Sequence, residues 1–114
     1  MSVTEPTASM LGTFNLRDTT DLATFKADFD ALCTHLVDVG MLLSWRLLER
    51  AYHDGFDAAF PETHLVIEMR FRDHETAQKT WDHFASHKPP ISALHGAVTR
   101  QVKDAHFALC HEVS

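Results

Sequence analysis

The stretch HLVIEMRFRD, residues 64 to 73, alternates between apolar and mainly polar side chains at successive positions. One side of an extended chain would carry Leu65, Ile67, Met69 and Phe71, and the other His64, Val66, Glu68, Arg70 and Arg72. A period of two residues is typical of a β-strand that buries one face. We therefore predict a strand over residues 64 to 73, with its odd-numbered residues in the core.

The residues upstream predict a long helix from about 20 to 39. Its apolar stripe recurs at intervals of three and four residues and consists of Leu22, Phe25, Phe29, Leu32, Leu36 and Val39. Asp18, Thr19 and Thr20 offer side-chain oxygens that could cap the first turn. Gly40 follows the last apolar residue and predicts a left-handed stop.

The remaining segments complete a recognisable order of elements. We expect strands over residues 10 to 17, 41 to 53 and 105 to 113. Asp73 should cap a second helix whose buried stripe is Ala77, Trp81 and Phe84, ending near His87 before Pro89 and Pro90, with a short helical segment from about 90 to 98. The order βαββαβ predicts an α+β, ferredoxin-like sandwich with a four-stranded antiparallel sheet and both main helices on one face. Right-handed crossovers give the strand order 4-1-3-2.

The composition of the 114-residue chain excludes several classes of protein. We expect one domain over residues 10 to 114, preceded by a flexible arm over residues 1 to 9. The net charge of −6 opposes nucleic-acid binding, and no apolar run approaches the roughly 18 residues of a membrane span. These features favour a soluble, cytoplasmic protein. Cys33 and Cys110 stand in no metal-binding or redox spacing, which favours two buried free thiols.

The face of the sheet that the helices leave uncovered is unusually apolar. Sorting the strand residues by parity places on the helix side Phe14, Leu16, Leu43, Trp45, Leu47, Leu65, Ile67, Met69, Phe71, Phe107 and Leu109. The other side mixes polar residues with Leu11, Leu42, Leu48, Val66, Ala108 and Cys110. Because a large exposed apolar patch usually marks an interface, we expect a homodimer in which a second sheet packs over this face.

The element order and three quoted segments resemble a known group of proteins. The segments are VDVGMLLSWRLLERAYHDGFD, THLVIEMRFRD and LHGAVTRQVKDAHFALCHEV. They resemble the dimeric α/β-barrel superfamily and, within it, a narrow family of uncharacterised bacterial proteins that share SWR followed by HDGF. The superfamily includes cofactor-free monooxygenases acting on polycyclic phenols, muconolactone isomerases, haem-dependent dismutases and stress-response proteins, so the resemblance implies a fold and leaves the activity open.

We expect a cavity between the two sheets of the dimer. Its predicted lining is Asn15, Arg46, Tyr52, His64, Glu68, Arg70 and His106. Glu68, Arg70 and His106 are the catalytic candidates, since an arginine could hold an enolate or carboxylate while the histidine or the glutamate takes a proton. A structural charge network between two sheets explains the same residues somewhat better.

A histidine pair, a single histidine and one loop are further candidate sites. His83 and His87 have the i, i+4 spacing of a metal-binding pair on a helix, but a solvated helix end is the preferred interpretation. His95 could line the mouth of a cavity, although a capping or packing role is favoured. The loop HDGFDAAFPET should be a connector whose Phe56 and Phe60 lie over the partner subunit or the cavity entrance.

No metal or cofactor is expected. The favoured function is a small-molecule-binding module with a small-molecule ligand. The alternative is a cofactor-independent monooxygenase or isomerase acting on a small aromatic or carbonyl compound.

Overall fold

The computed structural model describes residues 7–51 and 55–113 as an α+β domain. The strands are β1 (Ala8–Leu16), β2 (Ser44–Glu49), β3 (Leu65–Phe71) and β4 (Val102–His111), and the helices are α1 (Leu22–Asp38), α2 (His74–Ala85) and α3 (Ile91–Thr99). Every neighbouring pair of strands is antiparallel, and the sheet order is β2-β3-β1-β4. Because this is the predicted order 4-1-3-2 viewed from the other edge, the ferredoxin-like fold is confirmed.

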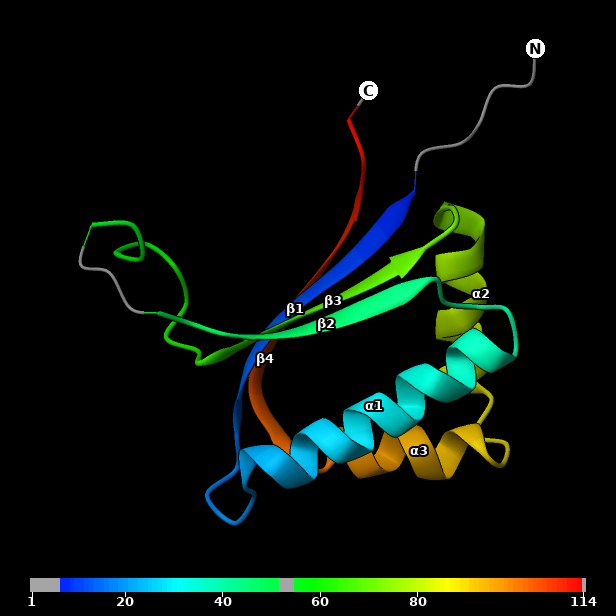
Figure 1. The fold of residues 1–114 in the computed structure, drawn as a ribbon, viewed down its shortest axis with the longest axis horizontal. Helices are drawn as coiled ribbons and strands as arrows, with labels where there is room; N and C mark the ends of the chain where they lie inside the picture. The colour runs from blue at the N-terminus through cyan, green and yellow to red at the C-terminus, as the bar shows by residue number, and fades with distance from the viewer. Residues whose placement is uncertain (1–6, 52–54, 114) are drawn as a thin grey trace.

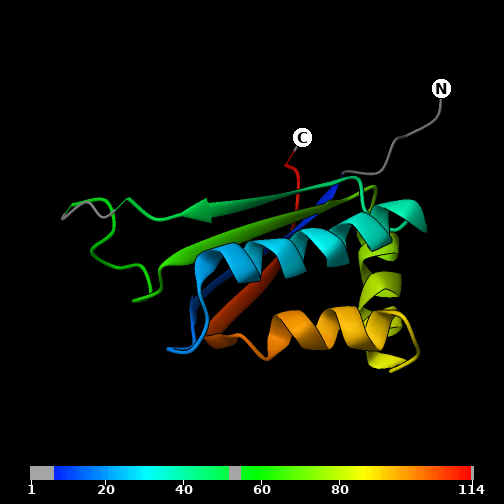
Figure 2. The same ribbon diagram turned by 60° about the horizontal axis from the view of Figure 1, so that its bottom comes forward.

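All three helices lie on one side of the sheet (Figure 1). Helix α1 packs against β2 and α3, while α2 contacts β1, β3 and α3 (Figure 2). The core between the sheet and α1 is aromatic, with the Phe14 and Phe25 rings 5.1 Å apart and the Phe25 and Phe29 rings 5.8 Å apart. No helix of the described residues lies on the opposite face of the sheet, as the βαββαβ order predicted.

Helix α1 begins and ends on local backbone signals. The Asp21 carboxylate accepts a hydrogen bond of 2.7 Å from the Thr24 amide, so the cap lies one residue after the three predicted candidates. This hydrogen bond also lowers the pKa of Asp21. Gly40 has a φ of 78°, and the amides of Gly40 and Met41 donate to the carbonyls of Val37 and Leu36. That pair of bonds is the Schellman ending, so the predicted glycine stop is confirmed.

The same helix ending corrects the prediction for the second strand. The amide of Leu42 also donates to the Leu36 carbonyl, so residues 41 to 43 still follow the helix end and β2 starts only at Ser44. Strand parity therefore does not apply there: Leu42 is 4% exposed in the core, whereas Leu43 is 52% exposed. The strand also stops at Glu49, short of the predicted residue 53.

The other strand boundaries differ from the predictions by a few residues. Strand β1 begins at Ala8, two residues early, and β4 spans Val102–His111 where residues 105 to 113 were expected. A register shift between Thr13 and Asn15 in the β1–β4 pairing and a positive φ of 56° at Asp104 mark the irregular start of β4. Helix α3, at Ile91–Thr99, confirms the predicted short helix.

Helix α2 is capped as predicted but ends sooner. The Asp73 carboxylate accepts from the Thr76 amide at 2.7 Å, which lowers the pKa of Asp73. The helix ends at Ala85, and His87 has a φ of 55°, so His87 does not share the helix with His83 as the metal-binding spacing required. Trp81, predicted in the buried stripe, is 66% exposed. None of the helices in the described part of the chain is long and apolar enough to cross a membrane.

Candidate functional site

An apolar cavity of about 640 Å³ lies between the sheet and the helices. Strands β1, β3 and β4 supply one wall, and all three helices supply the other. The side chains that shape it are mainly aromatic or aliphatic: Met10, Phe14, Phe25, Phe29, Leu32, Ile67, Met69, Phe71, Trp81, Phe84, Val98, Val102, Phe107 and Leu109. The cavity thus lies on the helix side of the sheet, within a single chain.

The cavity lies beside β4, over which no helix of the described residues packs closely. Helix α1 packs against β2 at the far edge of the sheet, and α2 stands across one end of it (Figure 2). Phe107 and Leu109 of β4 line the cavity from the helix side, as the parity of the strand residues predicted, but they are 61% and 43% exposed because no helix packs over them in the described part of the chain. Together with Trp81 they form an exposed apolar rim.

Gly12 shapes the floor of the cavity. A Cβ atom at this position would lie 2.7 Å from two atoms of the Phe107 ring and 3.1 Å from the Ile67 side chain. Gly12 faces both residues across the neighbouring strands. The missing side chain therefore lets the Phe107 ring lie across β1.

His95 of α3 is the one titratable residue among the described residues that line the cavity. Its ring stacks on Phe84 with a centroid distance of 4.2 Å and an interplanar angle of 3°. Burial, and secondarily the charge of His87, lowers the pKa of His95, so the imidazole is neutral at pH 7. The sequence interpretation favoured a packing role for His95, and the stacking on Phe84 confirms it. The cavity that His95 lines is not the one expected between two sheets.

The cavity offers little polar chemistry besides this imidazole. Its other polar lining residues are Gln78, Thr80 and Thr99, and the two threonine hydroxyls donate to the backbone carbonyls of Thr76 and Gly96. No lysine, arginine, aspartate or glutamate is among the described lining residues. Such a site suits an apolar ligand with few polar groups.

The predicted cavity-lining residues occupy different places. None of Asn15, Arg46, His64, Glu68, Arg70 and His106 lines the described cavity, and Tyr52 lies outside the described residues. Arg46 and Glu68 pair across β2 and β3 at 3.0 Å on the uncovered face. Their expected role between two sheets involves a second chain, so that role, and the catalytic candidacy of Glu68, Arg70 and His106, stays a prediction.

Asn15 and His64 meet at the end of the sheet. The Asn15 side chain accepts a hydrogen bond from the His64 amide at 2.9 Å and donates to the Glu62 carbonyl at 3.0 Å. The His64 ring lies 2.8 Å from the Glu49 carboxylate. These bonds join β1 to the two ends of the β2–β3 connection and so hold this end of the sheet together.

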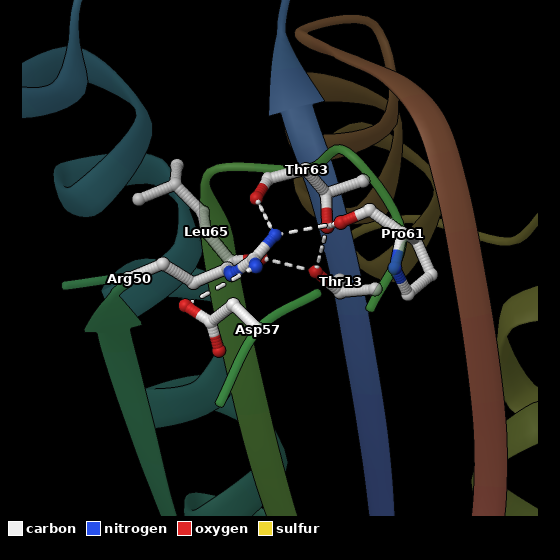
Figure 3. Close-up of polar contacts among 6 residues, drawn as sticks. All are labelled: Thr13, Arg50, Asp57, Pro61, Thr63 and Leu65. Atoms are coloured by element: carbon white, nitrogen blue, oxygen red, sulfur yellow. Dashed lines mark hydrogen bonds and ion pairs between the residues drawn. The ribbon is translucent and has the colours of Figure 1, made fainter. Parts of the chain in front are cut away.

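A largely buried arginine that the sequence analysis missed organises the β2–β3 connection (Figure 3). The Arg50 side chain is 9% exposed and donates to the carbonyls of Pro61 and Thr63, both at 2.6 Å. Its guanidinium lies 3.4 Å from the Asp57 carboxylate and 4.4 Å from the centre of the Phe60 ring. Arg50 thereby anchors the loop to the end of β2.

Thr63 continues this cluster into the sheet. Its hydroxyl is hydrogen-bonded to that of Thr13, which also donates to the Leu65 carbonyl at 2.9 Å (Figure 3). Both threonines are buried. Thr13 belongs to the uncovered face by parity, so this end of that face is closed by the loop.

The loop itself only partly follows the prediction. Phe60 is anchored by Arg50, but Phe56 is 94% exposed, and no residue of the loop lines the described cavity. The loop projects beyond the end of the sheet (Figure 1). Its expected contact with a partner subunit stays a prediction.

The remaining histidines and cysteines form no metal centre in the described part of the chain, where no group of three or more potential metal-binding residues occurs. His83 stacks instead on His35 of α1, with a centroid distance of 6.0 Å. Burial, with the charge of Asp30, raises the pKa of the Cys33 thiol to about 12. Cys33 is buried as predicted, but Cys110 is exposed, which corrects that prediction.

Comparison with known proteins identifies the family. Residues 10–114 match the model of a protein family described as a family of unknown function (DUF6614), so the chain belongs to that family. No curated protein matches it in sequence.

Solved structures share the fold at low sequence identity. SnoaB, a cofactor-independent oxygenase from Streptomyces nogalater, is 12% identical with a TM-score of 0.68 over 96% of this chain and 95% of that one. A dimeric ferredoxin-like protein of unknown function from Thermobifida fusca is 12% identical, with a TM-score of 0.64 over 98% and 96%. The hydroxynitrile lyase from Passiflora edulis is 10% identical, with a TM-score of 0.69 over 97% and 96%. These similarities establish the fold alone.

Proposed function

We propose that the protein is a homodimer and that each chain binds a small apolar molecule in the cavity between its own sheet and helices. The observation that carries the proposal is the cavity: about 640 Å³ of space enclosed mainly by aromatic and aliphatic side chains. A concave space of this size, lined by apolar side chains with few polar groups, is typical of a small-molecule site.

The exposed rim supports the same proposal. Trp81, Phe107 and Leu109 leave apolar surface in water at the cavity mouth. A bound apolar ligand would remove much of that surface from water, which is favourable by about 25 cal/mol per Å² before the costs of association. The mouth thus supplies part of the affinity and a route to the interior.

The uncovered face of the sheet supports the dimer. Leu11 and Leu48 are 39% and 42% exposed there, beside the Arg46–Glu68 pair. Dimeric proteins from Thermobifida fusca and Bacteroides fragilis have the same ferredoxin-like fold. Two such faces packed about a two-fold axis would bury these leucines. Light scattering at micromolar concentration should therefore give twice the mass of the chain, and the mass of one chain would refute the dimer.

Binding can be tested with an uncharged fluorescent probe, N-phenyl-1-naphthylamine. Its emission should rise on binding to the native protein. Ala105 of β4 lines the cavity from an exposed position, so Ala105→Trp should fill the cavity without crowding the core and should weaken probe binding by tenfold or more. The matched control is Ala31→Trp on the exposed surface of α1, away from the cavity. The proposed site would be refuted if both variants lost binding equally, or if neither variant lost binding.

A second candidate function is cofactor-independent catalysis on a small aromatic or carbonyl compound. The observation that favours it is the neutral His95 imidazole, which could accept a proton from a ligand held in the cavity. The test is turnover of phenolic substrates in air by the native protein. Loss of turnover in His95→Phe would place the chemistry in the cavity, whereas loss in Arg70→Ala and His106→Ala would place it between the sheets. Absence of turnover in the native protein would leave binding as the function.

A further inference from the structure

We infer that His95 selects the ligand, and that the cavity takes an uncharged ring compound whose hydroxyl group hydrogen-bonds to the His95 imidazole. This inference rests on the proposed function and adds to it the chemical class of the ligand. It follows from three features of His95: its stacking on Phe84, its unused ring nitrogens, and the lack of charged side chains in the described lining of the cavity.

The position of His95 is fixed by stacking. The ring lies flat against Phe84, with 4.2 Å between centroids and 3° between planes. A stacked imidazole keeps its two nitrogens at the ring edge, where they are free to meet a ligand in the plane of the ring. Because α2 and α3 both contribute to this pair, the ring is held by two elements of the fold.

The hydrogen-bonding capacity of His95 is unused by the protein. Neither ring nitrogen makes a side-chain hydrogen bond to any residue in the described ranges 7–51 and 55–113, although the residue is half-buried. A neutral imidazole presents one donor and one acceptor, and a ligand that displaces water from this wall of the cavity binds best if it replaces the hydrogen bonds of those nitrogens. A ligand hydroxyl can both donate and accept, so it satisfies either nitrogen.

The cavity lining argues against a charged ligand. A carboxylate or sulfonate would lose its hydration in a space whose described lining contains no lysine or arginine. A cation would meet no carboxylate there. Burial and, secondarily, the neighbouring His87 lower the pKa of His95, so the ring is neutral near pH 7 and is no counter-ion for an anion.

The aromatic lining favours a ring over a flexible chain. Phe14, Phe25, Phe29, Phe71, Phe84 and Phe107 surround the space with flat surfaces. Planar ligands can stack or pack edge-to-face on such rings, which adds to the effect of burial. A planar compound also loses less conformational entropy on binding than an alkyl chain of equal area.

The experiment compares three probes of similar shape: 1-naphthol, naphthalene and 1-naphthoate. Titration calorimetry or tryptophan quenching at pH 7.5 should show 1-naphthol binding about two- to tenfold more tightly than naphthalene, the gain expected of one neutral hydrogen bond, and 1-naphthoate binding most weakly. His95→Phe keeps a flat ring against Phe84 and should abolish the preference for 1-naphthol. The matched control is His74→Phe, at an exposed position on α2 that does not line the cavity, and it should keep the preference.

Acidification supplies a second readout. Protonation of His95 places a charge in the apolar cavity and removes its acceptor, so 1-naphthol should bind more weakly to the native protein as the pH falls through the pKa of His95, which burial lowers below the ordinary value of 6.5. The affinity of His95→Phe should change less over the same range.

The outcomes separate the two proposals. Equal affinity for 1-naphthol and naphthalene in the native protein would overturn the role of His95 while leaving the cavity as the ligand site. A preference for 1-naphthol that persists in His95→Phe would also overturn the role of His95 while leaving the cavity as the ligand site. Tight binding of 1-naphthoate would overturn the inferred ligand class, and failure of all three probes to bind would count against the proposed function itself.

Discussion

The two faces of the sheet differ in where their surplus apolar surface lies. On the helix side β3 is buried at each of its inward positions, whereas Phe107 and Leu109 of β4 are exposed and border a cavity. On the uncovered side the apolar residues are scattered among charged ones, as around the Arg46–Glu68 pair. A concave apolar space suits a small molecule, whereas a broad mixed face suits another sheet. One sheet can therefore carry two different binding surfaces.

The largest expected effect contrasts the closed and open parts of the helix side. Phe14 is 1% exposed in the aromatic core, so Phe14→Ala should lower the free energy of unfolding by about 3–5 kcal/mol. Phe107 is 61% exposed, and Phe107→Ala should cost less than about 1.5 kcal/mol. Urea denaturation measures both. Equal losses would mean that β4 is packed as tightly as β1 and that the cavity is absent.

The next contrast concerns two arginines, Arg46 within β2 and Arg50 just beyond its end. Arg50→Ala removes a 9% exposed guanidinium from two carbonyls and a carboxylate, and we expect a loss of about 1–3 kcal/mol. Arg46, 63% exposed in its pair with Glu68, should contribute under about 1 kcal/mol to the stability of a single chain. Hydrogen exchange of the loop amides should accelerate in Arg50→Ala alone. Unchanged exchange there would show that the loop is held by something else.

One substitution on the uncovered face should disrupt the proposed dimer. Leu11→Arg places a charge on the proposed dimer interface, and it should convert the protein to single chains at micromolar concentration, measured by light scattering. Because Leu11 lies on the opposite face from the cavity, binding of N-phenyl-1-naphthylamine should persist. A dimer that survives this change would move the interface elsewhere.

The smallest expected effect is the pH dependence of stability from His95. Its pKa is lower in the folded chain than the ordinary value of 6.5, so the unfolded chain binds more protons in the interval between the two values. Stability should therefore fall as the pH drops from 6.5 towards the folded pKa, and it should not change from this source above 6.5. Chemical denaturation at several pH values should show a shallower dependence for His95→Phe. Identical slopes would contradict the burial of this ring.

Local patterns predicted the sheet and α1 because each depends on neighbouring residues. The alternation in β3 and the Gly40 ending are of this kind. Parity assigned Leu42 to the wrong face because Leu42 belongs to the Schellman ending of α1, where its amide donates to the Leu36 carbonyl, and not to β2. A pattern of alternation gives the parity of residues within a strand but not the residue at which the strand starts.

The cavity could not be predicted because it depends on a gap in the packing between the helices and β4. Phe107 and Leu109 have the alternation of core residues, and only the placement of α2 and α3 shows that no helix covers them. Sequence reasoning therefore looked for a site between two sheets, on the even-numbered residues of β3. The role of Arg50 could not be predicted for a related reason. Its partners are the backbone carbonyls of Pro61 and Thr63, and only the path of the loop brings them next to its side chain.

The central claim is that the ligand site lies between the sheet and the helices. Amide chemical-shift mapping of an isotope-labelled sample during titration with 1-naphthol tests it most directly. We predict that the largest shifts cluster around Thr80, His95 and Phe107 on the cavity wall. Shifts concentrated instead at Arg46 and Glu68, on the uncovered face, would contradict the account.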